Sequence, residues 1–134
     1  MSNVQRVLIV GEEPEMVDFS DPAIPPGMDA DKVREGLRFA LDQLRKRGYD
    51  ADLVLTTTEQ AAADEVAASL RAKRYDCVVV GAGIRIVPKM TGMFEAVVNA
   101  VREAAPHARL AFNTSPEDSA NAAERQLRRT VETG

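Results

Sequence analysis

The sequence predicts a single-domain α/β protein with an open, doubly wound parallel sheet of four strands, of the flavodoxin-like or receiver-like class, and helices on both faces. Three observations support this prediction. Four short apolar runs recur along the chain, each is followed by a segment with helical spacing of apolar residues, and the 134 residues fit one domain (1–134). Right-handed crossovers on both faces favour the strand order 2-1-3-4.

The four apolar runs are rich in leucine and β-branched residues and do not alternate cleanly with polar ones, which is typical of parallel strands covered on both faces. They are RVLIV (6–10), ADLVLT (51–56), DCVVV (76–80) and RLAF (109–112). Cys77, the only cysteine, lies in the third run. We therefore expect a small core residue there, with no intramolecular disulfide and no cysteine cluster for zinc.

A helical stripe of apolar residues follows each strand. The four stripes are Val33, Leu37, Leu41 and Leu44; Ala63, Val66, Ala67 and Leu70; Met93, Phe94, Val97, Val98 and Val101; and Ala120, Ala123, Leu127 and Val131. Gly48 is expected to end the first helix. Thr57 with Gln60 predicts a capping box for the second, and Ser115 before Pro116 predicts the start of the fourth.

One connection is too long for a simple turn. The segment 11–29 is rich in prolines and acids, and a loop of that length inside a compact domain is usually functional or mobile. We interpret it as a lid. Its acids lack the spacing of an EF-hand, so a solvated acidic surface is favoured over a divalent-cation site, and no metal is predicted. The acids are Glu12, Glu13, Glu15, Asp18 and Asp21.

Composition and motifs exclude several classes of function. The net charge of −4, from 17 basic and 21 acidic residues, argues against a nucleic-acid partner. No apolar segment is long enough for a membrane span, and the first apolar run stops at Gly11, so a cytoplasmic location is expected. The turn at Gly81 and Gly83 has Ile86 where a dinucleotide fingerprint needs a third glycine, and no cofactor is predicted. His107 is expected at the amino end of the sheet, away from any crevice.

Ligands of such sheets bind outside the carboxyl ends of the strands, where the strand order reverses. For the order 2-1-3-4, this point lies between the first and third strands. The candidate ligand-binding residues are Glu12, Glu13, Thr57, Gly81, Gly83, Arg85, Lys89, Asn113 and Thr114. Arg85 and Lys89 could hold a carboxylate or a phosphate. The alternative is that Arg85 pairs with Glu12 or Glu13 across the crevice.

An apolar tract follows the third strand where a polar loop would be expected. The segment 84–94 contains Ile84, Ile86, Val87, Met90, Met93 and Phe94. Such a tract is normally covered. Either the lid or a second copy of the chain could cover it, and a symmetric homodimer is predicted. The expected interface residues are Ile86, Val87, Met90, Met93 and Phe94.

The chain resembles a family of short uncharacterised α/β proteins of flavodoxin-like or receiver-like fold. Three segments carry the resemblance: GAGIR (81–85), FEAVVNAV (94–101) and APHARLAFNT (105–114). The helix opening PGMDADKV (26–33) is a further candidate match. The resemblance implies a fold and no activity. Receiver domains carry a phosphoacceptor aspartate where this chain has Gly81, so a phosphorelay is not expected.

Three hypotheses of function stay open at this point. The first is a domain that binds a small molecule or an anion at the carboxyl ends of the first and third strands. The second is a non-catalytic homodimeric interaction module that uses the segment 84–94. The third is an enzyme without a catalytic histidine, such as a lyase or isomerase acting on a carboxylated substrate, and it requires a carboxylate of raised pKa in the crevice.

Overall fold

The computed structural model describes residues 4–133, with side chains described as far as Leu127. Its sheet consists of β1 (Arg6–Glu12), β2 (Asp50–Thr56), β3 (Cys77–Val80) and β4 (Arg109–Phe112), all parallel, in the order β2-β1-β3-β4. This confirms the predicted α/β class, the four-stranded parallel sheet and its strand order. The strand β1 continues two residues beyond the predicted run, because Gly11 and Glu12 pair with Leu55 and Thr56 of β2.

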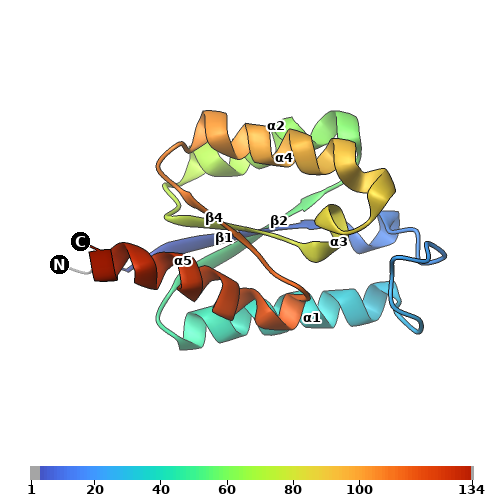
Figure 1. Cartoon of the computed structure of the whole chain (residues 1–134), viewed down its shortest axis with the longest axis horizontal. Coiled ribbons are helices and arrows are strands. Elements are labelled where there is room, and N and C mark those ends of the chain that lie inside the picture. The colour runs from blue at the N-terminus through green and yellow to red at the C-terminus, as the bar shows by residue number, and fades with distance from the viewer. Residues whose placement is uncertain (1–3, 134) are drawn as a thin grey trace.

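Four long helices cover the two faces of the sheet (Figure 1). On one face lie α2 (Glu59–Ala72) and α4 (Thr91–Ala104), and on the other lie α1 (Ala30–Lys46) and α5 (Ser119–Thr133). Short helical turns occupy the connections: η1 (Pro14–Met16), α3 (Ala82–Arg85), η2 (Pro88–Met90) and η3 (Pro116–Asp118). Three of these short turns begin at a proline, the residue that suits the first helical position.

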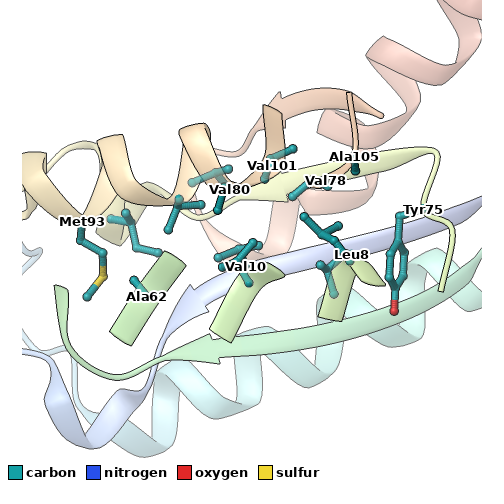
Figure 2. Close-up of a cluster of buried hydrophobic side chains, with 14 residues drawn as sticks. Leu8, Val10, Ala62, Tyr75, Val78, Val80, Met93, Val101 and Ala105 are labelled. Atoms are coloured by element: carbon teal, nitrogen blue, oxygen red, sulfur yellow. The ribbon is translucent and has the colours of Figure 1, made fainter. Parts of the chain in front are cut away.

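Successive residues of each central strand point to opposite faces, so one apolar run supplies two cores. Leu8, Val10, Val78 and Val80 point toward α2 and α4, as Figure 2 shows. The alternate residues Val7, Ile9, Cys77 and Val79 pack against α1 and α5. Burial raises the pKa of the Cys77 thiol to about 12, which leaves it an unreactive core residue as predicted.

The predicted helix stripes are largely confirmed. Gly48, with φ of +93°, ends α1: its N–H donates to the carbonyl of Arg45, and the N–H of Tyr49 donates to the carbonyl of Leu44, both at 3.0 Å. In α5, Ala120, Ala123 and Leu127 are buried, whereas the side chain of Val131 lies outside the described residues.

The predicted capping box of the second helix is wrong by one residue. Thr58, rather than Thr57, is the N-cap of α2, and its Oγ1 accepts a hydrogen bond from the N–H of Ala61 at 3.2 Å. The N–H and hydroxyl of Thr57 both donate to the carboxylate of Glu65. Two adjacent threonines precede the helix, and the Thr57–Glu65 contact decides which of them caps it.

The long connection between β1 and α1 folds against the carboxyl end of the sheet. In Figure 1 it lies at the right-hand end of the view, beside α3 and the start of α1. We call residues 13–29 the cover loop. Within the described part of the chain, no helix combines the length and the apolar character needed to cross a membrane.

Candidate functional site

A pocket of about 250 Å³ lies at the carboxyl ends of β1 and β3. Its floor is formed by the last residues of β1, its sides by the turn 81–87 and the segment 113–117, and its far wall by Lys32, Val33 and Leu37 of α1. This is the point at which the strand order reverses, where ligands bind in open α/β sheets. The pocket therefore lies where the strand order predicted a crevice.

The cover loop closes this pocket with apolar side chains. The six that line it are Val17, Phe19, Ala23, Ile24, Pro25 and Met28. These residues were not among the predicted site residues, although they alternate with acids and prolines in the sequence, which is a usable signal. The result is a mostly apolar compartment under a charged surface.

Ion pairs hold the cover loop in place at both of its sides. Lys89 of η2 pairs with Asp18 and with Asp21, the latter at 3.4 Å. Arg34 of α1 pairs with Glu15 at 2.6 Å and with Glu13 at 3.4 Å. Most of the loop acids thus neutralise basic side chains of the domain and are not free to bind a ligand.

Glu12 is the exception among these acids. It is the last residue of β1, it lines the pocket, and its carboxyl makes no hydrogen bond or ion pair with the residues that the structure describes. Burial raises the pKa of Glu12 to about 7, and the nearby charge of Lys89 opposes that rise only in part. Near neutral pH the group therefore exists in both protonation states.

The strand-end amides around the pocket are already hydrogen-bonded. The N–H of Ala82 donates to Oδ1 of Asn113 at 2.8 Å, and the N–H of Gly81 donates to the carbonyl of Val10 at 2.9 Å. The N–H of Thr114 donates to the carboxylate of Asp118 at 3.0 Å. Asn113 and Thr114 line the pocket, but their polar atoms tie β4 to α3 and η3.

Arg85 and Lys89 do not line the pocket. Arg85 donates to the carbonyl of Asn113 at 2.9 Å, and its guanidinium lies 5.8 Å from the centre of the Phe112 ring. The predicted alternative pairing of Arg85 with Glu12 or Glu13 is wrong for the described residues, because Glu13 pairs with Arg34 instead. Gly81 and Gly83 do line the pocket, whereas Thr57 lies outside it.

The predicted interface residues have different environments. Val87 and Met93 are 3% exposed and so are buried within the chain, whereas Ile86 is 47% exposed at the edge of the pocket. Met90 and Phe94 are partly buried, and the ring of Phe94 lies 5.9 Å from that of Phe112. Most of the apolar tract 84–94 is thus covered by the chain itself.

Among the described residues, no group of three or more His, Cys, Asp or Glu side chains is arranged to hold a metal ion. His107 is exposed in the turn before β4, at the amino end of the sheet, as predicted. The charged residues that line the pocket are Glu12, Lys32 and Glu117, and the rest of its lining is mostly apolar.

No model of a known protein family and no curated protein matches this chain. Among solved structures, it is similar to the crystal structure of a fragment described as a "putative lipoprotein" from Peptoclostridium difficile 630. The TM-score is 0.52 at 12% sequence identity, with 94% of this chain and 97% of the other chain covered. At this identity the similarity supports the α/β fold and carries no function.

Proposed function

We propose that this protein binds a small, mostly apolar molecule in the pocket at the carboxyl ends of β1 and β3. The observation that carries this proposal is the composition of the pocket: apolar side chains of the cover loop face apolar residues of α1 and of the turn 81–87. Ligand sites are typically concave, mostly apolar, and supplied with few polar groups.

The anion-binding form of the hypothesis receives less support. The two cations that it requires are engaged elsewhere, Arg85 with a backbone carbonyl and Lys89 with two aspartates. The amides of Gly81, Ala82 and Thr114 donate to acceptors within the chain. An anion would have to displace these contacts and would approach the carboxyl of Glu12.

The test is a ligand screen with a variant that narrows the pocket. Val33→Phe places a larger side chain in the wall contributed by α1. Val98→Phe, on α4, is the matched control because Val98 is another half-buried helical valine and does not line the pocket. Small apolar compounds should raise the melting temperature of the wild type and of Val98→Phe, since a ligand that binds only the folded state stabilises it.

Binding to Val33→Phe should fall at least tenfold, as measured by calorimetry or ligand-observed NMR. Equal binding to both variants would place the ligand elsewhere and contradict the proposal. Circular dichroism of the two variants verifies that the comparison is made on folded protein.

A second candidate is an enzyme in which Glu12 transfers a proton. The third sequence hypothesis required a carboxylate of raised pKa in the crevice, and Glu12 has one at about 7, near the value that favours general acid–base catalysis at neutral pH. Once a ligand is known, Glu12-dependent exchange of its C–H protons with deuterium from D₂O tests this function. Exchange that continues in Glu12→Gln would contradict it.

Three further predictions made from the sequence stay proposals. They are membership of the flavodoxin-like or receiver-like class, a cytoplasmic location and a homodimeric state. The parallel sheet and its order support the first.

A further inference from the structure

We propose that the ligand is a small apolar amine bound as its cation, and that Glu12 is the residue that binds its nitrogen. This inference rests on the proposed function, because it names the chemical class of the molecule in the same pocket. Three features of the site support it: the balance of charge around the pocket, the state of the Glu12 carboxyl and the size of the compartment.

The charged groups that face the pocket favour a cation. Two acids line it, Glu12 from β1 and Glu117 from η3. The one basic residue of the described lining is Lys32 of α1, whose Nζ donates to the carbonyl of Gly27 at 2.6 Å. Lys89 acts on Glu12 from outside the lining, but Asp18 and Asp21 neutralise its charge.

The Glu12 carboxyl lacks a partner that a cation would supply. It lies at the end of β1 among the residues that line the pocket, and burial is the largest cause of its raised pKa. Within the described chain its oxygens receive no hydrogen bond, although a carboxylate has acceptor sites for several. An ammonium group would donate to these oxygens and restore the stabilisation that the carboxylate loses by leaving water.

The size of the pocket limits the apolar part of the ligand. An apolar cavity of about 150 Å³ accommodates benzene. The volume of about 250 Å³ therefore suits a single ring with a short chain that carries the amine. An aromatic or cyclohexyl ring would lie against side chains such as Phe19 and Ile24, with the amine directed to the end of β1.

The experiment uses matched compounds that differ in one group. Phenyl, cyclohexyl and naphthyl bodies are each joined by two methylenes to an amine, a hydroxyl or a carboxylate, and are titrated calorimetrically at pH 6 and pH 8. The proteins are the wild type, Glu12→Gln and Glu95→Gln. Glu95 is an exposed acid on α4 that does not line the pocket, so its replacement is the control for loss of one negative charge.

We expect the amine to bind the wild type at least tenfold more tightly than the alcohol at pH 8. This preference should shrink at pH 6, where Glu12 is mostly protonated, and disappear in Glu12→Gln but not in Glu95→Gln. Binding of the amine should also release about half a proton at pH 7, because the bound ammonium lowers the pKa of the half-protonated Glu12 carboxyl. Calorimetric titrations in buffers of different ionisation enthalpy measure this release.

The other outcomes distinguish failure of the amine inference from failure of the proposed function. Equal binding of amine and alcohol, or a preference that survives in Glu12→Gln, would overturn the amine inference and leave the proposed function intact. Tightest binding of the carboxylate would overturn it in favour of an anion site. Absence of binding by all the compounds would overturn both. Should Glu12→Gln fail to fold, Glu12→Asp tests the same contact, since the shortened carboxylate should lose most of the preference.

Discussion

At the scale of single residues, Glu12 makes the stability of the fold depend on pH. Between its ordinary pKa of 4.5 and the folded value of about 7, the folded protein holds a proton that the unfolded chain releases, so stability falls as pH rises through this window. Because Glu12 is partly exposed, solvent screening limits the effect to about 1 kcal/mol.

Glu12→Gln should therefore unfold at a higher urea concentration than the wild type at pH 8, and its stability should change little between pH 5 and pH 7.5. Denaturation curves at these values measure both effects, with Glu95→Gln as the exposed control. The depressed pKa of Asp18, about 2 because of its hydrogen bond from Lys89, produces the opposite trend and only in more acidic solution. A wild type whose stability rises from pH 5 to pH 7 would show that burial does not dominate at Glu12.

Two glycines near the pocket should respond oppositely to alanine. A Cβ at Gly36 in α1 would lie 3.0 Å from Cβ of Pro116 and 3.1 Å from Oε1 of Glu117. Since the proline ring cannot yield easily, the crowding should exceed the helix propensity gained, and Gly36→Ala should lose about 1 kcal/mol of stability. A Cβ at Gly83 would meet no atom within 4 Å, and Gly83→Ala should gain about 0.5 kcal/mol.

Urea unfolding of both glycine variants measures this difference directly. Stabilisation by Gly36→Ala would mean that η3 moves away from α1 at little cost. Because Pro116 and Glu117 also line the pocket, such a movement would change the pocket wall as well.

At the scale of elements, Lys89 of η2 joins the cover loop to the β3 side of the pocket. Lys89 pairs with two aspartates of the loop, Asp18 and Asp21. Lys89→Met should therefore speed hydrogen exchange of the amides in residues 17–24 several-fold and accelerate ligand release, with little change in global stability, because exposed ion pairs contribute little to the folding free energy.

Lys73→Met is the matched control for this prediction. Lys73 pairs with Asp52 at 3.2 Å, away from the pocket, so its loss should leave exchange in the cover loop unchanged. The same exchange rates in both variants would show that the apolar side chains of the loop, rather than the ion pairs, hold it closed.

The elements themselves were predictable because they depend on local pattern. The apolar runs predicted the four parallel strands, the right-handed crossover rule predicted their order, and Gly48 predicted the end of α1. The N-cap of α2 was misplaced because Thr57 and Thr58 have the same local propensity, and only the tertiary contact of Thr57 with Glu65 separates them.

At the scale of the whole molecule, the location of the pocket followed from the strand order, but its chemistry did not. Sequence patterns place Arg85 and Lys89 near the switch point, yet they do not show which partner each side chain reaches, because Asn113 and Asp18 come from distant segments. The apolar side chains of the cover loop that line the pocket were not predicted for the same reason. The path of an irregular loop decides whether a side chain such as Phe19 or Ile24 lies against the pocket.

The predicted homodimer is also a property of the whole molecule, and the structure changes how it should be tested. Because Met93 is buried inside the chain, Met93→Glu would disrupt the core and would not report on an interface. Ile86 is the exposed large side chain of the predicted interface, so Ile86→Glu is the better variant.

If the chain self-associates through this surface, sedimentation velocity should show a dimer for the wild type at micromolar concentration and a monomer for Ile86→Glu. Phe39→Glu, which alters an equally exposed aromatic residue on α1, should stay dimeric and serves as the control. A wild type that sediments as a monomer at all concentrations would reject the dimer. In that case no second subunit covers the edge of the pocket at Ile86, and a small ligand can enter the pocket there directly from solvent.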